Sequence, residues 1–295
     1  MTLAAEFADS YQAHDSSPER LALEIARIAY PNLDIEQQLG QLDVLAEYVG
    51  RELTTGERTR TEEGDADRFL RVVTQQLDFH GDQENYHDPR NSLLPDVLER
   101  RMGLPIMLCL VCMAIGRRIG LQIVGLGFPN HYLALYRDGA GAVVLDPFLG
   151  ITLTPGEVER HLARMSGRPV QLAPDAWRPQ SAQEISLRIL HNLRNAYLTA
   201  KDLSMVLRVL DHLVAVNSAE PQYWRERGLL HYREKRWVEA HYDLRHYLVR
   251  VGLLGAVAPP GEGGQTPPQP ARANQGDKRI LEMYREAGAM LNRIN

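Results

Sequence analysis

Apolar side chains recur at helical intervals through the first part of the chain. Between residues 16 and 82 this spacing predicts a series of helices, the first of which starts at Ser17-Pro18, a typical pair for a helix N-cap and first turn. Residues 85–92 are rich in turn formers, and a further helix is expected to run from Leu93 toward Arg101. Residues 1–84 are therefore predicted to form a helical segment packed on the region that follows.

A strongly apolar helix is predicted over residues 104–119, with Pro105 in its first turn and Gly120 as its stop. After Gly120 the spacing of apolar residues changes from the helical period to alternation, which is typical of β-strands. Asp138-Gly139 is a strong hairpin signal between two of these strands. The strands are expected at residues 121–128, 132–136 and 142–145.

The segment 181–254 is predicted to be entirely helical, in four helices. Its second helix pair fits the tetratricopeptide repeat, which has a period of about 34 residues. Trp224 lies four residues before Gly228, and Ala240 lies twelve after it, as that repeat requires. The first pair fits less well, because Arg194 stands where a small residue is expected.

The last part of the chain changes composition twice. Residues 255–275 are rich in proline and glycine and are predicted to form a disordered linker. Residues 276–295 have the spacing of an amphipathic helix, which is expected to return and cover the repeats.

Composition restricts the classes of function. The chain has 295 residues and a net charge of -5, which is not the basic balance typical of a nucleic-acid-binding protein. No signal peptide is expected, and the longest apolar stretch, residues 104–116, is too short to cross a bilayer. These features predict a cytoplasmic protein that binds neither nucleic acid nor membrane.

The two cysteines, Cys109 and Cys112, both lie inside the apolar helix. Two cysteines cannot form a disulfide framework, and no second pair is present to complete a zinc site. Both are expected to be buried, reduced thiols. No cofactor is predicted. No metal site is predicted either, because His80, His87 and His131 lack the spacing of metal ligands.

His131 begins one predicted strand, and Asp146 ends the next. If Asp138 and Gly139 are the two loop residues of the hairpin, the side chains of His131 and Asp146 face each other directly and can hydrogen-bond. A different loop register would make them diagonal neighbours. The plainer alternative is that His131 is a turn residue and Asp146 a cap at a strand end. An imidazole held by a carboxylate is the part of a cysteine acyl-transfer site that activates the thiol.

Five stretches between residues 85 and 155 have a characteristic order and spacing. They read YHDPRNS (86–92), LERRMGLP (98–105), GRRIGL (116–121), GFPNHYL (127–133) and LDPF (145–148). In these stretches the chain resembles the bacterial SirB1 family, in which a transglutaminase-like core precedes tetratricopeptide-like helices. The resemblance implies a papain-like α+β core with a central helix on an antiparallel sheet. It carries over His131 and Asp146 as triad-like positions.

The resemblance leaves the nucleophile in question. Active transglutaminase-like proteins carry a Gly-x-Cys motif at the start of the central helix, and Gly103-Leu104-Pro105 occupies that place here. Proline is neither a nucleophile nor a proton donor. Cys109 lies one turn further along, about 6 Å down the helix axis. Its apolar neighbours predict a buried, inert thiol with a raised pKa.

The Asp88-Pro89-Arg90-Asn91 segment has two interpretations. In the structural one, it is a turn that leads into the next helix. In the functional one, Arg90 and Asn91 line the mouth of a cleft. The structural interpretation is favoured.

Two functions remain open. In the favoured one, residues 85–170 form a non-catalytic scaffold with a vestigial His131–Asp146 pair, and the cleft or the repeats bind a protein or peptide. The alternative is a cysteine-type amidase, peptidase or acyltransferase that uses Cys109, His131 and Asp146. A third possibility is that the His131–Asp146 pair only pins the hairpin. The predicted fold class is α+β, with a transglutaminase-like core followed by an all-α repeat domain.

Overall fold

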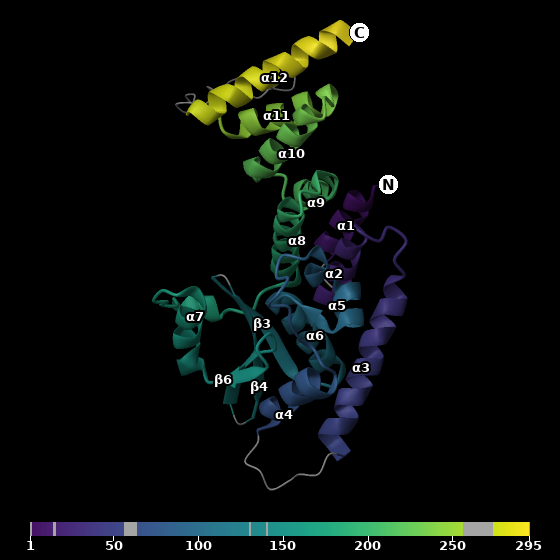
Figure 1. Cartoon of the computed structure of the whole chain (residues 1–295), viewed down its shortest axis with the longest axis vertical. Helices are drawn as coiled ribbons and strands as arrows, with labels where there is room; N and C mark the ends of the chain where they lie inside the picture. Colours follow the sequence, from purple (N-terminus) through teal and green to yellow (C-terminus); the bar gives the residue numbers. More distant parts are fainter. Residues whose placement is uncertain are drawn as a thin grey trace. The chain divides into compact units, whose positions relative to one another are not determined.

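The computed structural model describes residues 2–13, 16–55, 64–129, 131–139, 141–255 and 274–294. Backbone contacts divide the chain into two compact units. The core unit comprises Asp9–Lys201, and the repeat unit comprises Met1–Ala8 with Asp202–Asn295. Figure 1 shows both units, coloured along the sequence.

Helices make up the first part of the chain, as predicted. Ser17 caps α2, because its hydroxyl oxygen accepts a hydrogen bond from Arg20 N at 3.3 Å. Helix α1, which the sequence did not predict, precedes it. The helices are α1 (Leu3–Gln12), α2 (Pro18–Ala26), α3 (Ile35–Thr55) and α4 (Asp65–Arg71), which continues as one π-helical turn, η1 (Val72–Gln76).

Helix α6 (Pro105–Arg118) is the central helix of the core unit and confirms the predicted apolar helix. It ends before Gly120, whose positive φ of 77° reverses the chain. At Gly116 a β-carbon would lie 2.8 Å from the Ile123 side chain, so glycine lets this helix approach the sheet closely. Before α6 lie β1 (His80–Gly81), the 3-10 helix η2 (Pro89–Ser92), α5 (Leu94–Arg100) and β2 (Met102–Gly103), and β1 pairs with β2 in parallel.

Four antiparallel strands form the sheet of the core unit. They are β3 (Gln122–Phe128), β4 (His131–Asp138), β5 (Gly141–Asp146) and β6 (Ile151–Leu153), hydrogen-bonded in that order. The first three confirm the predicted strands, and β6 was not predicted. Helix α6 packs on one face of the sheet. Helix α7 (Val158–Ser166) covers the other (Figure 1). Its Val158 and Leu162 belong to one buried cluster with Leu126, Leu133 and Val144.

The β4–β5 hairpin has the second of the two registers that the sequence left open. Asp138 does not lie in the loop but pairs with Gly141, and Ala134 pairs with Leu145. The Asp138 carboxylate accepts a hydrogen bond from Gly141 N at 3.0 Å, which holds Asp138 at the entrance of the turn. The loop therefore lies one residue later than Asp138-Gly139. Across the hairpin, each residue of β4 faces a residue of β5 that lies two positions later than it would with an Asp138-Gly139 loop.

Residues 181–254 contain four helices, as predicted. The first, α8 (Ala182–Thr199), packs on α2 and η2 and belongs to the core unit. The unit boundary at Lys201 therefore falls inside the segment predicted to form the repeats. The other three, α9 (Leu203–Val216), α10 (Pro221–Arg233) and α11 (Trp237–Arg250), belong to the repeat unit.

Helix α12 (Gln275–Ile294) packs on α11, as predicted for the last helix (Figure 1). The Tyr247 hydroxyl donates to Asp277 Oδ1 at 2.6 Å, and the rings of His241 and Tyr284 stack 4.3 Å apart. Of the predicted linker 255–275, residues 256–273 lie outside the described residues. The core sheet with its central helix, followed by helical repeats, confirms the predicted fold class.

Candidate functional site

His131 and Asp146 meet at the end of the core sheet. His131 is the first residue of β4, and Asp146 is the last residue of β5. His131 Nε2 lies 2.9 Å from Asp146 Oδ2, and both residues are buried. Because of the shifted register they are diagonal neighbours, the alternative that the sequence had left open, rather than directly facing residues.

His161 is a third member of this cluster, and the sequence did not identify it. Its Nε2 atom lies 2.9 Å from the same oxygen, Asp146 Oδ2. Helix α7 places it there, because Val158, His161 and Leu162 form the buried side of that helix. A histidine between apolar residues on the buried face of an amphipathic helix was the available signal. It was weak, because a lone histidine gives no indication of its partner.

Both carboxylate oxygens of Asp146 have hydrogen-bond partners. Its Oδ1 accepts hydrogen bonds from Phe148 N at 3.1 Å and Leu149 N at 3.2 Å, while Oδ2 contacts the two imidazoles. Burial alone would raise the pKa of this carboxyl group. Hydrogen bonds and charge from His131 and His161 outweigh burial and lower the pKa to about 2. Asp146 is therefore an anion at neutral pH.

The cluster also has the chemistry of a metal site. One ligand atom from each of His131, Asp146 and His161 lies within 4.8 Å of the other two. Two imidazoles and a carboxylate suit zinc or another transition metal. Such sites need a fourth ligand or an open position for water, and all three residues are buried. The set as it stands is satisfied by its own hydrogen bonds.

A pocket of about 430 Å³ opens beside His131. Pro105, the first residue of α6, lies in its wall, so the structure brings together the two positions that the resemblance assigns to nucleophile and base. The lining residues are Tyr86, Pro105, Ile106, His131, Tyr132, Arg188 and Asn192. This group contains neither a thiol nor an aliphatic hydroxyl group.

Cys109 is fully buried in the core and is not among the residues that line this pocket. Its thiol donates a long hydrogen bond, 3.6 Å, to the backbone oxygen of Tyr132. Burial, together with the nearby Cys112 and Asp146, raises the pKa of the Cys109 thiol well above its ordinary value. Burial also raises the pKa of Cys112 to about 12. Both thiols have the surroundings of inert core residues.

Comparison with known proteins agrees with this architecture. A family model described as "Transglutaminase-like superfamily" matches residues 36–191, and a tetratricopeptide repeat model matches residues 193–274. The chain belongs to the transglutaminase-like superfamily. Residues 36–191 include the first part of α8, up to residue 191, and the repeat model begins inside the same helix at residue 193.

Two bacterial proteins are similar to most of the chain. A UPF0162 protein of Xylella fastidiosa is 32% identical over 235 residues, which cover 77% of this chain and 81% of that protein. A UPF0162 protein of Pseudomonas aeruginosa is 30% identical over 250 residues, which cover 81% and 90% of the two chains. Human F-box only protein 21 is 35% identical over 77 residues, only 12% of its length. Every helix within the described ranges is too short or too polar to span a membrane.

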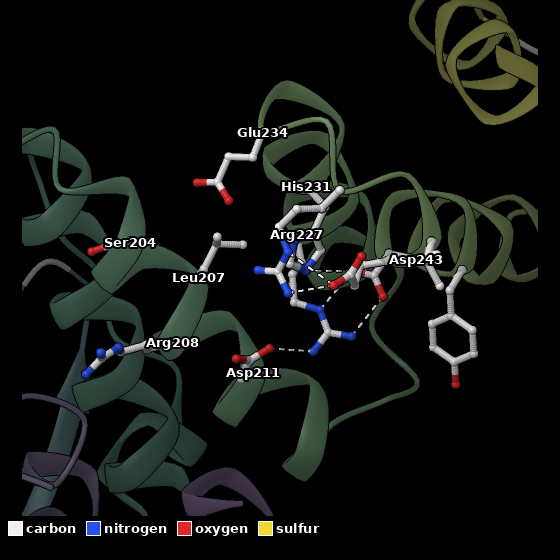
Figure 2. Close-up of a pocket in the computed structure, with 12 residues that line it drawn as sticks. Ser204, Leu207, Arg208, Asp211, Arg227, His231, Glu234 and Asp243 are labelled. Atoms are coloured by element: carbon white, nitrogen blue, oxygen red, sulfur yellow. Dashed lines mark hydrogen bonds and ion pairs between the residues drawn. The ribbon is translucent and has the colours of Figure 1, made fainter. Parts of the chain in front are cut away.

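The repeat unit contains a second pocket, of about 540 Å³, between α9, α10 and α11 (Figure 2). Val238 and Tyr242, one turn apart on α11, line it and are 64% and 55% exposed, although both are large apolar side chains. Inside it, Arg227 donates to both oxygens of the buried Asp243 at 2.8 Å, and to Asp211 at 2.8 Å. A groove with exposed apolar side chains above a fixed polar floor is suited to binding a peptide.

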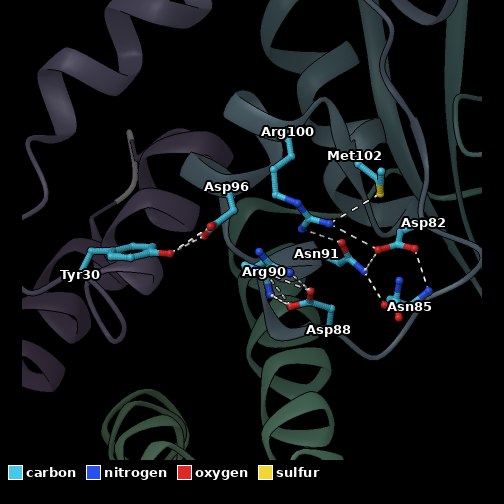
Figure 3. A network of polar contacts seen from close by, with 9 residues as sticks. All are labelled: Tyr30, Asp82, Asn85, Asp88, Arg90, Asn91, Asp96, Arg100 and Met102. Carbon is cyan, nitrogen blue, oxygen red and sulfur yellow. Dashed lines mark hydrogen bonds and ion pairs between the residues drawn. The ribbon is translucent and has the colours of Figure 1, made fainter.

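The loop that leads to α6 is held by a polar network (Figure 3). Asn91 is fully buried, and its Nδ2 donates to Asp82 Oδ2 at 3.0 Å and to Asn85 O at 2.8 Å. Arg100 Nη1 donates to Asn91 Oδ1 at 3.1 Å. Arg90 instead points outward and pairs with Asp88. Neither Arg90 nor Asn91 lines the pocket, so the structural interpretation of this segment is the correct one.

Proposed function

We propose that this protein is a non-catalytic member of the transglutaminase-like superfamily, of the SirB1 type, which acts in the cytoplasm by binding another protein. The observation that carries the proposal is the position of Pro105. It lies in the wall of the same pocket as His131, where the reactive thiol would have to be. The imidazole and its carboxylate are present, but the lining residues offer no thiol for them to activate.

The surroundings of Cys109 also support this proposal. A catalytic cysteine must be partly exposed and must reach the thiolate form near neutral pH. Cys109 is fully buried, its thiol is bound to a backbone oxygen, and its pKa is raised. A cysteine-type amidase, peptidase or acyltransferase would require this thiol to leave the core before it could react.

The repeat unit supplies the surface for the partner. Val238 and Tyr242 present apolar area to solvent on one face of α11, above the Arg227–Asp243 pair. Burial of exposed apolar side chains is the main driving force of protein association. We therefore place the partner-binding surface on this groove rather than on the core pocket.

Thiol labelling of the wild type, and of a variant with a cysteine at position 105, tests whether the protein lacks a reactive thiol. We expect native wild-type protein to resist iodoacetamide at both cysteines, and unfolded protein to react at both. The variant Pro105→Cys places a thiol at the start of α6, in the pocket with His131. Its thiol should react quickly, with an apparent pKa below about 7.5 because of the imidazole and the helix N-terminus. The double variant Pro105→Cys/His131→Ala should react more slowly. Labelling is located by mass spectrometry of peptides.

One result would contradict the non-catalytic proposal directly. If the native wild-type protein reacts at Cys109, and the reaction slows in His131→Ala, the buried thiol is accessible to the imidazole and the enzyme interpretation stands. Reaction at Cys109 that does not depend on His131 would instead indicate local opening of α6.

The binding surface is tested by site-specific photo-cross-linking in living cells. A photoreactive amino acid at position 238 should yield a discrete cross-linked species, because Val238 lies at the groove. The matched control is position 44 on α3, since Val44 is 67% exposed but lies in the core unit. The variant Tyr242→Ala should weaken the cross-link from position 238. Equal cross-linking from positions 238 and 44 would remove the support for the groove.

A further inference from the structure

Arg188 is a half-buried cation that faces the core pocket without a carboxylate partner among the described residues. Its Nη2 atom donates to the backbone oxygens of Phe128 and His131, each at 2.8 Å. Its guanidinium also lies 5.4 Å from the centre of the Tyr132 ring. These contacts join α8 to the ends of β3 and β4. They use only one of the three guanidinium nitrogen atoms.

Arg188 lines the pocket and keeps donors that no protein acceptor uses among the described residues. An arginine side chain has five N–H groups, and the two on Nη2 are engaged, so those on Nη1 and Nε are left. Burial without a counter-charge lowers the pKa of this guanidinium, although it stays protonated at any physiological pH. A partly buried cation that lacks an anion nearby is costly unless a ligand supplies that anion.

Asn192 adds a second free polar group to the same wall. It lies four residues after Arg188 on α8, so both side chains project from one face of the helix into the pocket. Within the described part of the chain, its amide makes no hydrogen bond. The other polar residues of the lining, Tyr86, His131 and Tyr132, bear no negative charge at neutral pH, and no acidic residue lines the pocket.

We propose that this pocket binds the anionic end of a small ligand, a carboxylate or a phosphate group, on Arg188 and Asn192. The guanidinium pairs with the anion through charge-assisted hydrogen bonds, and the Asn192 amide donates one more. A volume of about 430 Å³ accommodates a small organic anion rather than a folded partner. The site is independent of the groove in the repeat unit, so it stands or falls separately from the partner-binding proposal.

The test measures the stability of the full chain against ligand concentration. A ligand that binds only the folded state raises the unfolding temperature in proportion to the logarithm of its concentration, once that exceeds Kd. Sodium phosphate and sodium acetate are the two probes, and sodium chloride at the same ionic strength is the control for screening. In parallel, the Nε–Hε signal of Arg188 is followed by NMR in arginine-labelled protein, and we expect it to shift with each anion that binds.

Three variants assign the binding to the pocket. Replacement of the charged donor in Arg188→Gln should weaken anion binding by about tenfold or more. Asn192→Ala should weaken it by about threefold, and this residue holds no backbone oxygen, so its loss does not disturb the sheet. Arg160→Gln is the matched control, because the Arg160 side chain is 78% exposed on α7. Binding in that variant should equal that of the wild type.

The outcomes separate the sources of the anion. If only phosphate stabilises the protein, the ligand carries a phosphate group. If only acetate does, the ligand carries a carboxylate. If both do, the pocket accepts an anion of either kind. If neither anion stabilises the wild type beyond sodium chloride, the proposal is overturned. It is also overturned if Asn192→Ala and Arg188→Gln, both folded, bind as tightly as the wild type does. Because thiol labelling does not enter these measurements, their failure leaves the non-catalytic proposal untouched.

Discussion

Asp146 in the core unit and Asp243 in the repeat unit are both fully buried carboxylates, but they are held in different ways. Asp243 receives two hydrogen bonds from the Arg227 guanidinium, each 2.8 Å long (Figure 2). Asp146 contacts two imidazoles and two backbone N–H groups. The guanidinium is a permanent cation that bonds both oxygens of Asp243. The first site is therefore a fixed, bidentate ion pair, whereas in the second four separate groups each contribute one contact to the carboxylate.

The difference follows from what each site joins. The Arg227–Asp243 pair links α10 to α11, and Arg227 also bonds Asp211 of α9, so one guanidinium connects the three helices of the groove. The contacts of Arg227 thus hold these helices together. His131 also borders a pocket, and its ring is oriented by a carboxylate as in a cysteine hydrolase. The core site therefore combines a contact between two strands with a position in the wall of a pocket.

The largest expected effect comes from breaking the fixed pair. Asp243→Ala leaves the Arg227 guanidinium without its bidentate partner, and its side chain is only 14% exposed. The free energy of unfolding of the repeat unit should fall by about 3–5 kcal/mol. Asp211→Ala is the matched control, since it removes the other, half-exposed partner of the same arginine and should cost less than about 1 kcal/mol. Urea unfolding followed by tryptophan fluorescence measures both. Equal losses would show that Arg227 does not depend on Asp243.

A smaller effect on the free energy of unfolding is expected from the ionisation of Asp146, and it is confined to acid pH. The pKa of its carboxyl group is lowered to about 2 in the folded protein, against about 3.9 in an unfolded chain. The unfolded state therefore binds the proton first as the pH falls. The stability that ionised Asp146 contributes, about 2 kcal/mol, is complete above pH 4 and is lost between about pH 4 and pH 2. Asp146→Asn should lose this pH dependence as well as part of the stability at neutral pH. A wild type and an Asp146→Asn variant with parallel acid profiles would contradict the assignment.

Much of the core site was visible in the sequence. Helix α6, three strands and the positions of Pro105, His131 and Asp146 all followed from local spacing and from the family resemblance. Local spacing did not decide between the two registers of the hairpin, in which Asp138 pairs with Gly141 and its carboxylate accepts a hydrogen bond from Gly141 N. Such a contact depends on one side-chain hydrogen bond, which the Asp-Gly pattern does not reveal. The predicted domain boundaries remain predictions.

His161 and Arg188 were missed for a different reason. Each comes from a helix that lies later in the chain than the strands it contacts, so its partner is set by tertiary packing. His161 looks like any histidine on an amphipathic helix until α7 packs on the sheet. Arg188 lies in a segment predicted to belong to the repeats, whereas α8 belongs to the core unit. Arg188 and Asn192 are one helical turn apart, and this spacing was the available signal, but the sequence analysis did not recognise it.

The smallest expected effect concerns His231, which lies in the repeat unit beside the fixed pair. Its Nε2 atom is 3.8 Å from Asp243 Oδ2, and its buried Nδ1 has no hydrogen-bond partner among the described residues. Burial lowers the pKa of this imidazole in the folded state, although the charge of Asp243 opposes that effect. The unfolded chain then takes up a proton first as the pH falls below about 6.5, so the folded state loses a little stability, less than about 1 kcal/mol.

His231→Gln should remove this loss between pH 7 and pH 5 and leave the Asp146 window below pH 4 unchanged. Because the two windows do not overlap, one series of urea titrations over pH separates the two sites. If the wild type instead gained stability between pH 7 and pH 5, His231 would be protonated beside Asp243. The contact between His231 and Asp243 would then be an ion pair at low pH.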